Sequence, residues 1–300
     1  MVVIRLALAA MAFSFGGCAR GAVVEGPVAT PPAAVAFRLG ALSLTSLRDA
    51  AFVVPNNGQD IGAGAGPAAV AGVLAAAGAA GDRLVLSVNA LLVRMPGRLV
   101  LIDTGLGPTD HGGLPASLAL AGVSPDQITD VLITHGHGDH VGGLLRADGK
   151  PAFPRATVRM SAREWAWMKG KSANRALVAA IAPKVVTFAP GRPVLPGITP
   201  IALYGHTPGH VGYEIVSAGQ RLEDIGDIAH SSIVSLARPD WADGFDEDRK
   251  AGETTRRAEL ARLAAGGERV FAPHFPFPGV GRIVNRGSGF AWRPGLPATR

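Results

Sequence analysis

Residues 135–140 read His135-Gly136-His137-Gly138-Asp139-His140, which places four potential metal ligands within six positions. The preceding segment, 131–134, is apolar and β-branched and predicts a buried strand, and the following segment, 141–145, can begin a helix. Gly136 and Gly138 allow a tight turn that aims several side chains at one point. Imidazole and carboxylate together suit zinc or another first-row transition metal. This run makes a metal-dependent enzyme the leading hypothesis.

The composition indicates a globular protein. The chain has 300 residues, of which 48% are hydrophobic and 17% are charged, so it can bury a large core. The net charge is +6, but the lysines and arginines are scattered and never form a long run. A groove for nucleic acid needs clustered basic residues interleaved with aromatic ones, so we expect no nucleic-acid partner.

The first 18 residues have the features of an export signal, with Arg5 ahead of an apolar stretch too short to span a bilayer. Phe15-Gly16-Gly17-Cys18 resembles a degenerate bacterial lipobox, which implies a lipid on Cys18; a plainly secreted protein is the alternative. Cys18 is the only cysteine, so no intramolecular disulfide can form. We expect an exported protein, periplasmic or lipid-anchored, with a signal at 1–18, a flexible tether at 19–34 and one domain at 35–300.

The remaining pattern predicts strands in two blocks, each interrupted by helices. Strands are expected at 37–39, 41–47, 84–95, 99–103, 131–134, 156–160, 185–188, 198–203, 211–217, 269–272, 282–285 and 289–293, and helices at 115–122, 162–169 and 246–265. The Gly-rich stretch 56–67 lacks the spacing of a dinucleotide fingerprint and is interpreted as a mobile loop. Strands outnumber helices, which favours a sandwich of mixed sheets covered by helices.

Polar side chains follow several predicted strands at their carboxyl ends. The motifs are Asp103-Thr104-Gly105, Thr207-Pro208-Gly209-His210, Gly226-Asp227 and Pro273-His274. Loops at strand ends build sites on a rigid scaffold, so we expect these residues to meet near the 135–140 run.

Taken in order, these motifs resemble those of the metallo-β-lactamase superfamily, over roughly Leu84 to His274. The resemblance implies an α/β (α+β) fold, a four-layer αββα sandwich with two metal ions at one edge. It implies His135, His137 and His210 as ligands of one metal, Asp139, His140 and His274 as ligands of the other, and Asp227 as the bridge. Asp103 would not bind a metal itself but would accept a hydrogen bond from a ligand imidazole or a loop amide and so fix its orientation. His206 would shape its turn, and His111 would lie on the surface.

The reaction that suits such a site is hydrolysis. Two neighbouring cations, zinc by default with Mn, Fe or Co as alternatives, lower the pKa of a shared water and make it a hydroxide nucleophile. Asp139 and Asp227 would take part in catalysis as ligands beside the reacting atoms. His230, one helical turn after Asp227, is a further catalytic candidate that could donate a proton or hydrogen bond to the substrate; a packing role is the alternative.

Three segments resemble one branch of the superfamily more closely. Residues 226–230, 274–281 and 89–93, the last ahead of the strand and turn at 99–105, are similar to the branch that contains methyl parathion hydrolase and relatives among the acyl-homoserine lactone lactonases. The resemblance implies hydrolysis of a lactone, a carboxylic ester or an organophosphate triester. Lactonases often carry a tyrosine shortly after the bridging aspartate, where this chain has His230. Candidates for an apolar wall beside the substrate are Trp165, Trp167, Phe245, Phe275 and Phe277.

Other readings stay open at this point. Within the fold, the alternatives are a glyoxalase-type thioesterase, an iron-dependent oxygenase and a β-lactamase; the last is less favoured because Asp227 stands where some zinc β-lactamases carry a cysteine ligand. Outside enzymes, the alternative is an exported, non-catalytic metal-binding protein. The expected partner is a small ester-like molecule, with membrane contact only through a lipid at Cys18, and a homodimer is left open.

Overall fold

The computed structural model describes residues 26–296. The expected signal at 1–18, with Cys18, lies outside the described residues. Among the residues that are described, no helix is both long and apolar enough to cross a membrane.

The first strand begins earlier in the chain than we expected. Residues 26–34, assigned to a flexible tether, instead form the first part of strand β1 (Gly26–Leu39), which pairs antiparallel with β2 (Leu42–Pro55). A register shift between Ala29 and Ala33 accommodates the prolines of this segment. The tether prediction was wrong for this part because a proline-rich segment can still pair as an edge strand.

Two sheets make up the centre of the molecule. The seven-stranded sheet has the order β1-β2-β4-β5-β6-β7-β8, with β4 (Arg83–Met95), β5 (Arg98–Ile102), β6 (Asp130–Leu132), β7 (Thr157–Ser161) and β8 (Val185–Phe188). The six-stranded sheet has the order β15-β14-β13-β11-β10-β9, with β9 (Ile198–Ala202), β10 (Val211–Ser217), β11 (Gln220–Asp224), β13 (Arg269–Phe271), β14 (Val280–Arg286) and β15 (Gly289–Pro294). Most of these strands fall within a few residues of the predicted ones. The exceptions are β1 and β2, which extend well beyond the predicted 37–39 and 41–47, and β11, for which no strand range was predicted.

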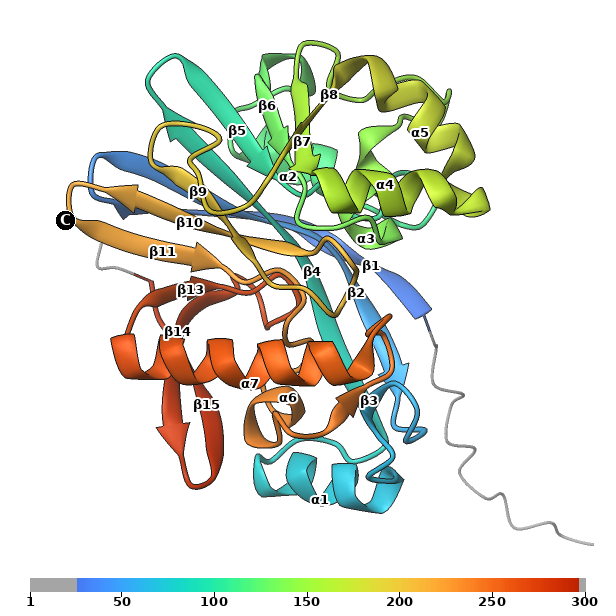
Figure 1. The fold of residues 1–300 in the computed structure, drawn as a ribbon, viewed down its shortest axis with the longest axis vertical. Helices are drawn as coiled ribbons and strands as arrows, with labels where there is room; N and C mark the ends of the chain where they lie inside the picture. The colour runs from blue at the N-terminus through green and yellow to red at the C-terminus, as the bar shows by residue number, and fades with distance from the viewer. Residues whose placement is uncertain (1–25, 297–300) are drawn as a thin grey trace, which may run out of the picture.

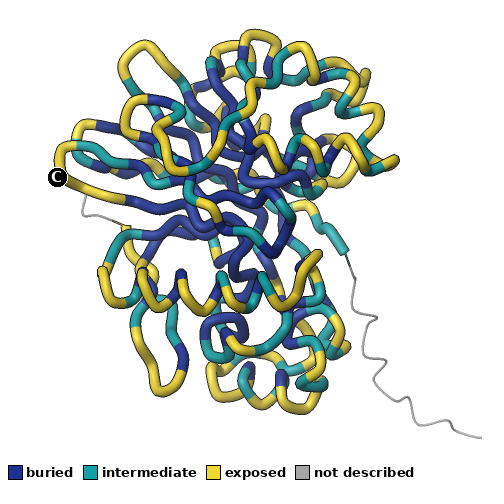
Figure 2. Tube along the Cα trace, viewed as in Figure 1, coloured by how far each residue is buried: buried dark blue, intermediate teal, exposed yellow. Residues whose placement is uncertain are grey.

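Alternation along the strands divides the core into layers. Val100 and Ile102 of β5 face the second sheet, whereas Leu99 and Leu101 face the opposite side. Because neighbouring side chains of a strand point to opposite faces, a strand that is apolar throughout must be covered on both sides. Figure 2 shows the resulting buried layers in the sheets and the exposed outer faces of the helices.

Helices supply the two outer layers (Figure 1). The outer face of the first sheet is covered by α2 (Leu114–Leu120), α4 (Ala162–Gly170) and α5 (Arg175–Ile181), and the outer face of the second by α7 (Arg249–Gly266). The other helices are α1 (Pro67–Ala76) and the single-turn α3 (Gly138–Val141) and α6 (Val234–Ala237). The arrangement confirms the predicted αββα sandwich.

The Gly-rich stretch is more ordered than we predicted. Within it, β3 (Ile61–Ala63) pairs with β12 (Ala242–Asp243). Gly62 has a positive φ, and a Cβ there would lie 2.8 Å from Val70 and 2.9 Å from Trp241. Glycine is therefore required at this position by both conformation and packing, and the mobile-loop interpretation was wrong.

Candidate metal centre

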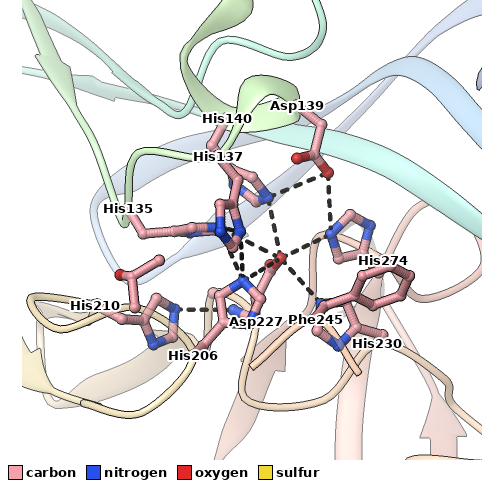
Figure 3. Close-up of polar contacts among 12 residues, drawn as sticks. His135, His137, Asp139, His140, His206, His210, Asp227, His230, Phe245 and His274 are labelled. Carbon is pink, nitrogen blue, oxygen red and sulfur yellow. Dashed lines mark hydrogen bonds and ion pairs between the residues drawn. The ribbon is translucent and has the colours of Figure 1, made fainter. Parts of the chain in front are cut away.

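The site lies at one edge of the sandwich, where parallel strands end together. Strands β5, β6 and β7 are parallel neighbours in one sheet, and β11 and β13 are parallel neighbours in the other. Their carboxyl ends therefore carry their loops to the same side. Figure 3 shows His135–His140, His206, Asp227, His230 and His274 converging there from four different loops.

Three histidines form a close triangle of ring nitrogens. His135 Nε2 lies 3.1 Å from His137 Nδ1 and 3.1 Å from His206 Nε2, and the last two atoms are 2.9 Å apart. Burial lowers the pKa of His135 and His206 well below the ordinary value, so these rings are neutral. Tetrahedral zinc with nitrogen ligands at roughly 2.0–2.1 Å brings the nitrogens to a comparable spacing. The triangle fits a metal ion.

This geometry corrects the prediction for His210. Its Nδ1 faces the carbonyl oxygen of Leu203 at 2.8 Å, and its Nε2 accepts from the backbone N–H of Asp227 at 3.0 Å. Both ring nitrogens are thus occupied by the protein, and no lone pair is left for a metal. His206, which we expected only to shape the turn, stands in the ligand position instead.

The second group of possible ligands contains Asp139, His140, Asp227 and His274. Asp139 Oδ2 is 3.4 Å from His140 Nε2 and 3.3 Å from His274 Nε2. Burial raises the pKa of Asp139, but the neighbouring His140 and His274 outweigh it and lower the pKa to about 2. An ionised carboxylate beside two imidazoles is a ligand set that a divalent cation accepts.

Asp227 occupies the middle of the site (Figure 3). Its Oδ2 lies 3.0–3.6 Å from a ring nitrogen of each of five histidines: His274, His140, His230, His206 and His135. In the described part of the chain, the buried atoms Asp227 Oδ1 and His140 Nε2 have no hydrogen-bond partner. Buried polar atoms left unpaired are costly, so both atoms point to cations that they would bind. The site is therefore suited to two metals that share Asp227.

Protein groups behind the rings fix their orientation. His140 Nδ1 lies 2.7 Å from Asp103 Oδ2, His206 Nδ1 lies 3.2 Å from Asp246 Oδ1, and His274 Nδ1 lies 2.8 Å from the carbonyl oxygen of Ser87. Each contact turns the other ring nitrogen toward the centre. Asp103 lies where the sequence predicted it, whereas Asp246 and Ser87 carried no motif that could have revealed them.

His230 lies at the side of this centre. Its Nδ1 is 2.8 Å from Asp243 Oδ2, and its Nε2 is 3.3 Å from Asp227 Oδ2. Burial lowers the pKa of His230, but Asp243 and Asp227 outweigh it and raise the pKa well above the ordinary value. Asp243 belongs to β12, so the pairing of β12 with β3 helps to place this dyad.

A cleft of about 330 Å³ opens onto the centre. Beside the polar residues it is lined by Phe52, Val54, Leu86 and Phe245. Three of these were missed, because they lie on β2 and β4, strands of 14 and 13 residues that run past the usual strand length. The unusual length of these strands was the feature that could have indicated their part in the cleft wall.

The predicted aromatic wall is mostly elsewhere. Of its five members only Phe245 lines the cleft. Trp167 packs edge-on against His137 with ring centres 5.8 Å apart, and Phe275 is buried against Trp292. Trp165, which lies on α4, packs against the hydrophobic core. The guanidinium of Arg48 lies over the ring of Phe277.

Comparison with known proteins agrees with this architecture. The family model described as the metallo-beta-lactamase superfamily matches residues 83–274. The structure of AidC, a dizinc quorum-quenching lactonase in complex with the product N-hexanoyl-L-homoserine, is similar with a TM-score of 0.85 at 27% identity, over 89% of this chain and 99% of AidC. The structure of AbOPH, a hydrolase in the beta lactamase superfamily, is similar with a TM-score of 0.80 at 31% identity, over 90% of this chain and 100% of AbOPH.

A curated relative supports the same assignment over a shorter stretch. Metallo-beta-lactamase domain-containing protein 1 of Mus musculus is 44% identical over 62 residues, which are 21% of this chain and 21% of the mouse protein. The match therefore spans about a fifth of that relative's length. The family match, which covers more than half of the chain, shows that this chain belongs to the metallo-β-lactamase superfamily, and the two groups of histidine and aspartate side chains lie where they could hold metal ions.

Proposed function

We propose that this protein is a dinuclear hydrolase that cleaves neutral, apolar esters, with lactones carrying an acyl chain as the first candidates. The observation that carries the proposal is the position of Asp227 Oδ2, which lies between the two ligand groups at the floor of a cleft whose remaining wall is apolar. Carboxylic esters and organophosphate triesters share the same requirements and are the other members of the proposed class.

Different side chains of the centre have different roles in the proposed reaction. When bound, a pair of divalent cations would supply an activated water and polarise the bond under attack. His135, His137 and His206 would hold one cation, Asp139, His140 and His274 the other, and Asp227 both. His230, oriented by Asp243, presents Nε2 to the cleft, where it can hydrogen-bond a substrate oxygen that gains negative charge.

The lining of the cleft favours an uncharged substrate. Among the described residues, its lining contains no lysine or arginine. An anionic substrate, such as a β-lactam carboxylate or a glutathione thioester, would find no lysine or arginine there, and His230 is already paired with Asp243 and Asp227. Phe52, Val54, Leu86 and Phe245 instead offer apolar surface to an acyl or alkyl group. The similarity to AidC, which is described as a lactonase, supports placing lactones first.

The test is a substrate panel on purified protein of measured metal content. The panel holds short- and long-chain acyl lactones, an aryl carboxylic ester, a dialkyl aryl phosphotriester, a β-lactam and a glutathione thioester. We expect two metals per chain, with the long-chain lactone hydrolysed most efficiently and with activity lost on chelation and restored by zinc. Preferred hydrolysis of the β-lactam or the thioester would overturn the proposed class. Two tightly bound metals with no hydrolysis of any ester would overturn the enzymatic role.

A further inference from the structure

Glu164 is a buried carboxylate that belongs to neither ligand group. It lies in the first turn of α4 and is fully shielded from solvent. Its Oε1 accepts from the backbone N–H of Gly136 at 2.8 Å, and its Oε2 accepts from Thr207 Oγ1 at 2.7 Å and from the backbone N–H of Gly209 at 2.9 Å. One side chain therefore bonds to two loops that come from different sheets.

Those two loops carry the three histidines of the nitrogen triangle. Gly136 lies between His135 and His137, and Thr207 directly follows His206. In the described part of the chain, the side-chain oxygens of Glu164 receive hydrogen bonds only from these loops. All three partners are donors that the two carboxyl oxygens accept, so this side chain ties both loops to α4.

Ser161 completes the contact from the N-cap of the same helix. Its Oγ donates to the carbonyl oxygen of Gly209 at 2.7 Å and accepts from the backbone N–H of Glu164 at 3.1 Å. Gly209 is thus held at both its N–H and its carbonyl group. A Cβ on Gly209 would lie 2.1 Å from the backbone nitrogen of Glu164, and a Cβ on Gly136 would lie 2.4 Å from Met168 of α4. Both loops are packed directly onto the helix.

We infer that Glu164 is a positioning residue that sets the spacing of His135, His137 and His206, and hence the affinity of the metal that these three residues would bind. The inference rests on the proposed two-metal function. The second group is held by other means: Asp103 contacts the His140 ring, Thr104 Oγ1 donates to the His140 carbonyl oxygen at 2.8 Å, and Asp227 and His274 follow strands of the other sheet. Loss of Glu164 should therefore weaken one metal site and spare the other.

The decisive variant is Glu164→Gln. Glutamine has the same shape, but its amide NH₂ would face an N–H or O–H donor in place of one accepting oxygen. Cobalt titration, followed by visible absorbance and by competition with a chelator, reports each metal separately from activity. We expect wild-type protein to bind two cobalt ions, and the variant to bind one with unchanged affinity and the other about 10- to 100-fold more weakly.

A matched control is Asp130→Asn. Asp130 is a buried carboxylate at the opposite end of β6, where it accepts from Arg98 at 2.8 Å and Arg159 at 2.9 Å. This change should lower thermal stability while leaving both cobalt affinities unchanged. Ser161→Ala, which removes the second anchor of Gly209, should weaken the same cobalt site as Glu164→Gln, but to a smaller degree, and serves if the glutamine variant fails to fold.

Three results would overturn the positioning role. They are unchanged binding of both ions by Glu164→Gln, equal weakening of both sites, and weakening in Asp130→Asn that matches that in Glu164→Gln. Failure of the proposed function is seen separately, as wild-type protein that binds two cobalt ions and hydrolyses no ester.

Discussion

His210 Nε2 accepts a hydrogen bond from the backbone N–H of Asp227, with 3.0 Å between the two nitrogen atoms. The ring stands directly behind the turn that carries the central carboxylate, and a Cβ on Gly226 would lie 2.3 Å from this ring nitrogen. Because Leu203 fixes the other nitrogen, the ring cannot turn to offer a lone pair to the cleft. His210 therefore supports the backbone of Asp227 and leaves the metal position to His206.

Alanine variants of the two histidines should have different effects. His206→Ala removes one corner of the nitrogen triangle, so we expect the purified protein to keep one metal per chain and to lose nearly all activity. His210→Ala leaves the Asp227 amide unpaired in a buried position, which costs about 1–3 kcal/mol of stability, but it should keep two metals. Metal content after desalting and urea denaturation measure the two effects. A His210→Ala protein with one metal beside a His206→Ala protein with two would reverse the assignment.

The fold could be predicted from the sequence because local patterns and tertiary packing agree. Strand β5 is apolar on both faces from Leu99 to Ile102, so the burial of this segment between two layers follows from composition alone. The start of β1 could not be predicted, because its Ala- and Pro-rich sequence resembles a linker and becomes a strand only by pairing with β2. Helix α1 was missed for a similar reason, since Ala and Gly with few large side chains give no clear apolar stripe.

The site could be predicted as a set of motifs but not as a set of contacts. His206 and His210 are four residues apart in one loop, and spacing cannot decide which ring faces the metal. The decision depends on Leu203 and Asp227, which occupy both nitrogens of His210. Part of the cleft wall was missed for another reason, because the strand predicted at 41–47 ended before Phe52 and Val54 of β2.

The His230–Asp243 dyad should affect turnover more than metal binding. His230→Ala removes a donor that faces the cleft, and we expect kcat to fall about 100-fold with two metals retained. Asp243→Asn keeps the ring but weakens its orientation, so the fall in kcat should be smaller and in the same direction. Steady-state kinetics with metal analysis on the same samples test this. Loss of a metal in His230→Ala would instead make His230 a ligand, since His206, Asp227 and His230 also lie close enough to hold an ion.

Phe245 should control the preference for long acyl chains. The residue is 37% exposed at the mouth of the cleft, with its ring centre 5.1 Å from that of His230, so Phe245→Ala should fold normally. Loss of this apolar surface should raise KM for a long-chain lactone about tenfold and leave KM for a short-chain lactone nearly unchanged. Phe290→Ala, on β15 outside the cleft lining, is the control. An equal change in KM for both chain lengths would exclude Phe245 from the acyl-binding wall.

The buried carboxyl of Glu223 should make stability depend on pH. Burial and the neighbouring Glu259 raise the pKa of Glu223 to about 9, although the guanidinium of Arg262, which also contacts Glu259 and Glu268, opposes the shift. A carboxyl whose pKa is raised by folding stabilises the protein below its ordinary pKa, and this stabilisation is lost as the pH rises through about 9.

Glu223→Gln cannot ionise, so its melting temperature should fall less than that of the wild type between about pH 5 and pH 9.5. We expect the difference to be on the order of 1–3 kcal/mol, or roughly 2–10 °C in Tm. Differential scanning calorimetry at matched ionic strength measures it, with Glu253→Gln in the exposed pair with Arg257 as the control. Parallel pH profiles for the wild type and Glu223→Gln would show that Glu223 is already ionised in the folded protein, with Arg262 outweighing Glu259.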